Sequence, residues 1–91
     1  MEESHDEITQ RIRAFVLTKL EPRGITQVDD RDSLVASGVV DSLGVFQLVA
    51  FLEDAFDIRV RDEEIALEHF ESVQNTARFV ATKKGLGERK A

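Results

Sequence analysis

Near the start of the chain, apolar residues recur at helical spacing behind a polar pair that favours a helix start. Ser4 and Glu7 lie three residues apart, which is the spacing of a capping box. Pro22 and Gly24 favour a helix end, because proline restricts the residue before it and glycine adopts turn conformations. The pattern predicts a helix over residues 5–20. Its apolar positions are Ile8, Ile12, Phe15, Val16 and Leu20.

A second helix is predicted from Asp41 to about Phe56, with Asp41 as its N-cap. Leu43, Phe46 and Ala50 fall outside its main apolar stripe, so the helix is apolar on more of its circumference than one core contact requires. We weigh two positions for Phe46 equally: the core, and a surface that meets a partner. The main stripe consists of Val45, Leu48, Val49, Leu52 and Phe56.

Two further helices are predicted in the C-terminal part. Three acidic residues at 62–64 favour a helix start, but the helical pattern persists only to about Glu68, so this third helix is short. Ser72 is placed to cap a fourth helix, which Gly85 ends. Residues 58–61 alternate like a strand, yet four residues without a pairing candidate predict a link between helices. The expected fold class is all-α, with four helices.

The connection between the first two helices, residues 21–40, is longer than compact domains usually contain without a packing or functional reason. We expect it to pack as a lid over the helices. With 91 residues the chain makes one folded domain, predicted as residues 1–85, followed by a flexible basic tail over residues 86–91. Candidate anchors of the loop are Val28, Leu34, Val35, Val39 and Val40.

Charge narrows the classes of partner. The net charge is −6, and residues 41–71 hold nine acidic and two basic side chains, which disfavours nucleic acid and favours a partner with a basic surface. The chain has no cysteine, and His5 and His69 lack companions at ligand spacing, so no metal site is expected. No apolar run approaches the length of a membrane span and no export signal is visible, which predicts a cytoplasmic protein without membrane contact. We also expect the protein to be a monomer.

The chain contains none of the common enzyme motifs, and no histidine is obviously paired with a nucleophile. The remaining candidate is Ser42, a hydroxyl at the predicted start of a helix, between Asp41 and Leu43. One interpretation is that Asp41 and Ser42 only cap the helix, as these residue types prefer to do. The other is that Ser42 carries a phosphate ester, since a helix N-terminus favours negative charge.

Asp41, Ser42 and Leu43 resemble the hallmark of acyl carrier and peptidyl carrier proteins, in which Asp-Ser-Leu opens the second helix of a four-helix bundle. The resemblance extends over about residues 5–84. It includes Leu34 and Gly38 upstream, the apolar run at residues 48–56, the acidic link at 58–64, and the start of the last helix at 70–73.

The resemblance implies that a separate phosphopantetheinyl transferase attaches 4′-phosphopantetheine from coenzyme A to Ser42, with Asp41 supporting the transfer as helix N-cap. The terminal thiol of that arm would hold acyl or aminoacyl groups as thioesters. Ligases would load the carrier, and downstream transferases or synthases would unload it. The chain itself is then no enzyme. The second helix would provide the surface that partners recognise, through Leu43, Phe46, Glu53 and Asp54.

Asp32, Ser33 and Leu34 repeat the same tripeptide nine positions earlier. A short, turn-rich stretch follows this first copy, so Ser33 is predicted to belong to the loop and Ser42 to be the attachment site.

Gly44 and Gln47 depart from the carrier family's pattern, because fatty-acid carriers frequently have acidic residues there. This favours a specialised pathway, and residues 70–73 look more like those of aminoacyl or peptidyl carriers. Two alternatives stay open: a non-catalytic helical interaction domain, in which Ser42 only caps a helix, and, more weakly, a small hydrolase that uses Ser42.

Overall fold

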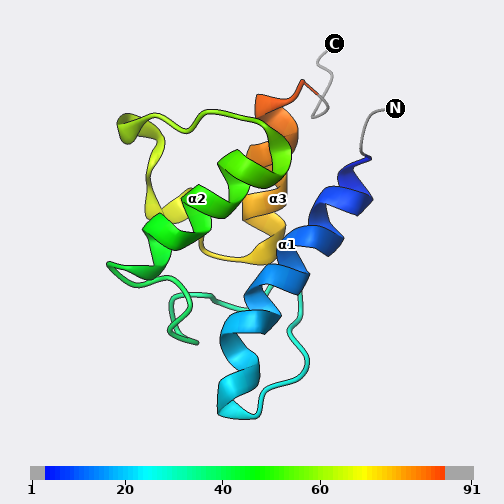
Figure 1. Cartoon of the computed structure of the whole chain (residues 1–91), viewed down its shortest axis with the longest axis vertical. Helices are drawn as coiled ribbons and strands as arrows, with labels where there is room; N and C mark the ends of the chain where they lie inside the picture. The colour runs from blue at the N-terminus through cyan, green and yellow to red at the C-terminus, as the bar shows by residue number, and fades with distance from the viewer. Residues whose placement is uncertain (1–3, 86–91) are drawn as a thin grey trace.

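The computed structural model describes residues 4–85, and within them three α-helices alternate with 3-10 turns and no strand is present. Helix α1 spans His5–Leu20, α2 spans Gly44–Phe56 and α3 spans Val73–Lys83 (Figure 1). The predicted all-α class is therefore confirmed. The predicted basic tail at residues 86–91 lies outside the described residues. No helix of the described part is long and apolar enough to span a membrane.

Helix α1 has the bounds that the sequence predicts. Its capping box is complete, because the Glu7 amide donates to Ser4 Oγ at 3.1 Å and the Ser4 amide donates to Glu7 Oε1 at 3.0 Å. The helix continues into the 3-10 turn η1, Glu21–Arg23, and Gly24 then reverses the chain at a φ of 83°. Its buried face consists of Ile8, Ile12, Val16 and Leu20, as the spacing predicts.

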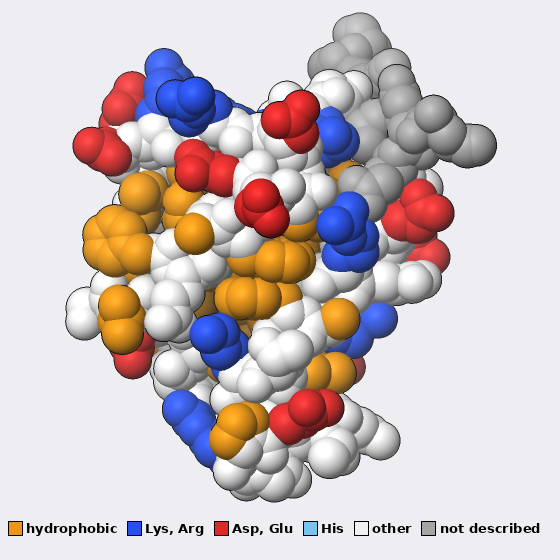
Figure 2. Space-filling view, viewed as in Figure 1, with side chains coloured by type: hydrophobic (Ala, Val, Ile, Leu, Met, Phe, Trp, Pro, Cys, Tyr) orange, Lys and Arg blue, Asp and Glu red, His pale blue; other side chains and the backbone are white. Residues whose placement is uncertain are grey.

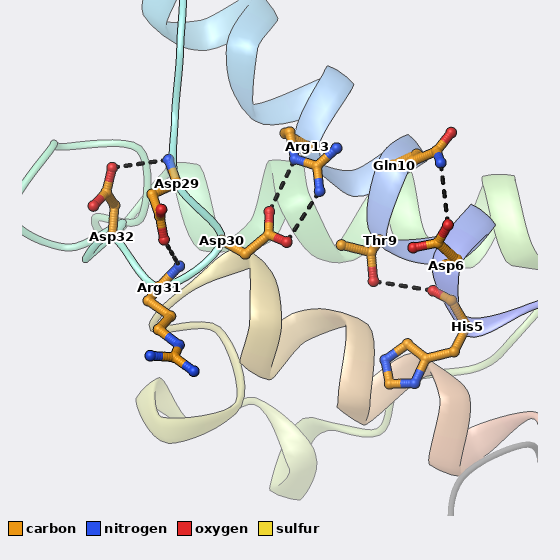
Figure 3. A network of polar contacts seen from close by, with 9 residues as sticks. All are labelled: His5, Asp6, Thr9, Gln10, Arg13, Asp29, Asp30, Arg31 and Asp32. Atoms are coloured by element: carbon orange, nitrogen blue, oxygen red, sulfur yellow. Dashed lines mark hydrogen bonds and ion pairs between the residues drawn. The ribbon is translucent and has the colours of Figure 1, made fainter.

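The long loop between α1 and α2 is tied to α1 on one side and to the start of α3 on the other. Arg13 in α1 forms a two-pronged ion pair with Asp30, at 2.9 and 3.0 Å (Figure 3). On the other side, the Gln74 amide of α3 donates to the Asp30 carbonyl at 2.8 Å. The Leu34 amide of the loop donates to the Glu71 carbonyl at 2.7 Å. These contacts fix the backbone of the loop although it contains neither helix nor strand.

Four of the five predicted anchors of this loop are confirmed. Leu34, Val39 and Val40 are buried in the common core, and Val28 is half-buried and packs against it. Val35 was predicted to be an anchor and is 41% exposed, so that part of the prediction is wrong. Residues 34–38 form a turn whose one side contacts the core, and Val35 lies on the opposite side.

The predicted short third helix is replaced by two separate 3-10 turns. These are η2, Asp62–Glu64, and η3, Leu67–His69. Between them the backbone leaves the helical region, with ψ of 85° at Ile65 and 142° at Ala66. Each turn is too short to satisfy an α-helical hydrogen-bond ladder, and only three α-helices are present within residues 4–85.

Helix α3 confirms the predicted fourth helix. Ser72 Oγ accepts from the Asn75 amide at 3.0 Å and caps it, and Gly85 follows the helix at a φ of 77°. Lys83 pairs with Glu64 at 2.8 Å and so joins α3 to η2. The Arg61 amide, together with Lys83, lowers the pKa of Glu64. Lys84 Nζ, directly after α3, donates to the Phe56 carbonyl at the end of α2 at 3.1 Å.

Candidate functional site

The segment that leads into α2 is anchored immediately before the candidate serine. Val39 and Val40 are buried, and the Val40 amide donates to the Leu34 carbonyl at 2.9 Å. The next three residues, at positions 41–43, are all exposed. The chain therefore leaves the core at Asp41 and presents Ser42 at the surface, directly before the first turn of α2.

Asp41 organises this turn, but the helix begins later than predicted. Asp41 Oδ1 accepts from the Gly44 amide at 2.6 Å and from the Leu43 amide at 3.2 Å, which closes an Asx-type turn. As a result α2 starts at Gly44, three residues after the predicted start, and Leu43 occupies the N-cap position. The prediction that Asp41 is the N-cap residue is thus wrong in position. Its carboxylate nevertheless accepts hydrogen bonds from two backbone amides at the start of α2.

Ser42 is exposed, and its hydroxyl makes no hydrogen bond to any residue in the described part of the chain. A covalent attachment at this oxygen would therefore disrupt no internal contact. The N-terminal end of α2, which follows directly, carries the partial positive charge that favours a phosphate nearby. The geometry fits a phosphate ester on Ser42.

Gly44 has a role that the sequence analysis missed. A Cβ at this position would clash with the Val39 carbonyl oxygen and would lie 3.0 Å from Asp41 Oδ1. Glycine is thus required for the close approach between the start of α2 and the buried segment before it. In the sequence the residue only looks like a departure from helix propensity, because the contact depends on the tertiary fold.

A cluster of exposed apolar side chains lies beside the serine. Leu43 is 65% exposed and Phe46 is 60% exposed, which places Phe46 outside the core. Leu67 on η3 is 59% exposed. Figure 2 shows hydrophobic side chains gathered at the left edge of the molecule, over the start of α2 and the η3 turn. We call Leu43 and Phe46 the apolar patch.

The two acidic candidates on α2 lie in different environments. Glu53 is half-buried, and its Oε2 accepts from the Val60 amide at 2.9 Å, so this carboxylate closes the connection after α2. Asp54 is exposed. The first turn of α2 contains no acidic residue. Of the two, Asp54 has the geometry expected of a residue that meets a partner.

Two basic residues that the sequence analysis did not select lie next to the serine segment. Lys19 and Arg23, from the end of α1 and from η1, help to line a shallow depression of about 170 Å³ that also borders Asp41, Leu43 and Gly44. Lys19 Nζ donates to Gln47 Oε1 at 3.0 Å, and Arg23 Nη1 donates to the Ser37 carbonyl. Isolated surface cations carry no periodic signal, so the sequence pattern offered no means of finding them.

Comparison with known proteins connects this geometry to a family. Residues 10–80 match the sequence model of the family described as phosphopantetheine attachment site. An acyl carrier protein of Prochlorococcus marinus (strain MIT 9515) is 34% identical, over 90% of this chain and 99% of its own length. The acyl carrier proteins of Borrelia garinii subsp. bavariensis and Borreliella burgdorferi (strain ZS7) are 31% and 27% identical, each over 89% of this chain and 98% of its own length.

Proposed function

Since this chain belongs to the phosphopantetheine-binding acyl carrier protein family, we propose that Ser42 is the residue that carries its 4′-phosphopantetheine arm. Members of this family are carriers and not enzymes, and they hold acyl groups on that arm. The observation that supports Ser42 is its exposed hydroxyl, which is free of internal hydrogen bonds within residues 4–85 and lies directly before α2.

Several residues have separate roles around the Ser42 oxygen. When bound, the phosphopantetheine group supplies the thiol that forms a thioester with the cargo. Ser42 provides the oxygen of the phosphodiester bond. Asp41 holds the turn closed through the Leu43 and Gly44 amides, which constrains the backbone around Ser42. Val39 and Val40 anchor the turn in the core.

The surface of α2 supports a specialised pathway rather than general fatty-acid synthesis. Its first turn has no carboxylate, and the exposed side chains that follow Ser42 include the apolar Leu43 and Phe46, while Asp41 before it is occupied by the Leu43 and Gly44 amides. Partner enzymes that select strongly acidic carriers would find few charges to pair with here. The cargo in this proposal is an acyl or aminoacyl group supplied by a discrete ligase, and the carrier acts as a cytoplasmic monomer.

Recognition by partners is proposed to use Leu43 and Phe46, with Asp54 as the exposed acidic contact. Apolar side chains that are more than half exposed contribute to binding when a partner removes them from water. Glu53 contributes indirectly in this proposal, because its carboxylate is engaged by the Val60 amide and maintains the end of α2.

The attachment site is tested by incubating the purified apo protein with a broad-specificity phosphopantetheinyl transferase, magnesium and coenzyme A. The expected result is a mass gain of one phosphopantetheinyl group, which peptide mapping assigns to Ser42. Loading with a panel of amino-acid and fatty-acyl ligases then identifies the cargo class. An unchanged mass would contradict the proposal and favour a non-catalytic interaction domain.

The recognition surface is tested with Phe46→Ser, using Ile25→Ser as the matched control. Ile25 is also an exposed apolar residue, at 39%, but it lies in the long loop and not in the apolar patch. Phe46→Ser is expected to lower the rate of cargo loading by the cognate ligase about tenfold or more, as loss of an aromatic contact does at interfaces. Ile25→Ser should leave the rate unchanged. Equal rates for both variants would show that partners bind elsewhere.

A further inference from the structure

The segment that carries Ser42 is held on both sides by cations, Lys19 from the end of α1 and Arg23 from η1. Upstream of the serine, Arg23 Nη1 donates to the Ser37 carbonyl. Downstream, Lys19 Nζ donates to Gln47 Oε1 at 3.0 Å, within the first two turns of α2. Both residues line the depression next to Asp41 and Gly44.

Arg23 lies against the backbone of Gly38, a position that requires glycine. Gly38 has a φ of 85°, and a Cβ there would lie 3.0 Å from Arg23 Nη2 and 3.2 Å from Nη1. The planar guanidinium therefore lies directly against the Gly38 backbone while it donates to the preceding carbonyl. An arginine suits this position because its flat, forked head packs and donates at the same time.

The position of Arg23 is transmitted along the chain to the serine turn. The next residue after Gly38 is Val39, whose carbonyl packs against Gly44 at the start of α2. Ser42 lies between Val39 and Gly44 in the sequence. A shift at Ser37 and Gly38 would therefore change the packing of Val39 on Gly44, and with it the turn that Asp41 closes.

We propose that Lys19 and Arg23 are positioning residues that brace the two flanks of the Ser42 turn and set how the serine is presented to the modifying transferase. This inference rests on the proposed attachment at Ser42. Of the two residues that depart from the acidic pattern of the family, the glycine at position 44 is explained by the close approach of the Val39 carbonyl. Gln47 accepts from Lys19, and Gly44 accommodates the Val39 carbonyl.

Arg23→Gln and Lys19→Gln test the brace, with Arg31→Gln as the matched control. Arg31 is exposed in the same loop, and its guanidinium makes no hydrogen bond or ion pair within residues 4–85 (Figure 3). Amide hydrogen exchange of the apo protein is measured first, without any enzyme. In Arg23→Gln, the Val40, Gly44 and Val45 amides should exchange about fivefold faster or more, as expected for loss of one hydrogen bond, while α3 amides stay protected.

The kinetics of modification provide the second readout. Arg23→Gln should raise the KM for the apo carrier about fivefold at unchanged kcat, because a smaller fraction of molecules presents the serine correctly. Lys19→Gln should do the same, with faster exchange at Gln47 as well. Arg31→Gln should match the wild type in both measurements. Slower modification with unchanged exchange would overturn the brace and indicate direct contact with the transferase.

Arg23→Lys separates geometry from charge. It keeps the positive charge but lacks the planar fork, so only partial recovery of exchange protection and KM is expected. Full recovery would show that charge alone suffices and would overturn the proposal. A wild-type protein that is not modified at all would refute the attachment at Ser42. The exchange experiment would then still report on the brace independently.

Discussion

Two copies of the tripeptide Asp-Ser-Leu, at residues 32–34 and 41–43, lie in the same long connection, and the fold uses them differently. In the first copy Leu34 is fully buried and the Ser33 hydroxyl accepts from the Ala36 amide at 3.0 Å. In the second copy Leu43 is 65% exposed and the Ser42 hydroxyl has no partner in the described part of the chain. One copy anchors a loop, and the other presents a serine hydroxyl to solvent.

The two aspartates show where the difference arises. Asp32 Oδ2 accepts from the Asp29 amide, which precedes it, and so it stabilises the turn behind it. Asp41 Oδ1 accepts from the amides of Leu43 and Gly44, which follow it, and so it organises the start of a helix. Identical side chains thus take their role from the next apolar segment. After the first copy comes a single turn, and after the second comes an α-helix of 13 residues.

The largest expected effect separates the two serines. Ser42→Ala should abolish phosphopantetheinylation, because no other oxygen is presented in the same way before α2. Ser33→Ala should be modified at the wild-type rate, although it loses one turn hydrogen bond. Intact mass spectrometry after incubation with the transferase and coenzyme A measures both. Helical circular dichroism should be unchanged in Ser42→Ala, so loss of modification would not reflect unfolding. Modification that persists in Ser42→Ala would assign the site to another residue.

The two leucines should differ in their effect on stability. Leu34→Ala removes a fully buried side chain and should lower the free energy of unfolding by about 2–4 kcal/mol. Leu43→Ala changes a side chain that is 65% exposed, and its effect should stay within about 0.5 kcal/mol. Urea unfolding followed by circular dichroism compares the two variants. Comparable losses would mean that Leu43 is packed in solution and that the two copies are not opposites.

The smallest expected effect concerns the residue that follows each copy. Gly44→Ala would ordinarily stabilise a helix by up to about 1 kcal/mol. Here the added methyl group meets the Val39 carbonyl, so we expect a net loss of roughly 1 kcal/mol. Val35, at the corresponding position after the first copy, is 41% exposed. Val35→Ala should therefore leave the free energy of unfolding almost unchanged. Thermal unfolding gives the comparison, and a stabilised Gly44→Ala would show that α2 moves away from Val39 without cost.

Local patterns were sufficient where the structure depends on neighbours in the sequence. The capping box at Ser4 and the cap at Ser72 mark the starts of α1 and α3 because each cap is made within one turn of chain. The start of α2 was predicted three residues too early for a related reason. An aspartate before a helical pattern can accept from the following amides both as an N-cap and in an Asx-type turn, so the residue type alone does not fix the first residue of the helix.

The pattern of apolar and polar residues could not predict features that depend on tertiary contacts. The acidic residues at 62–64 favour a helix start, yet the chain becomes extended at Ile65 and Ala66 and the expected helix divides into η2 and η3. Ser42 was selected because its signal is local and matches a family motif. Lys19 and Arg23 were not, because their partners at Gln47, Ser37 and Gly38 are distant in sequence.

The ties between the long loop and α3 have a consequence for the order of events during synthesis. The Leu34 amide depends on the Glu71 carbonyl, and the Asp30 carbonyl depends on the Gln74 amide. During synthesis, Ser42 is translated before the Glu71 carbonyl and the Gln74 amide exist. A nascent chain, or one that ends before Glu71, would lack both hydrogen bonds that tie the loop before Ser42 to the start of α3. The loop that leads to α2 therefore gains both of these hydrogen bonds only after the start of α3 has been translated.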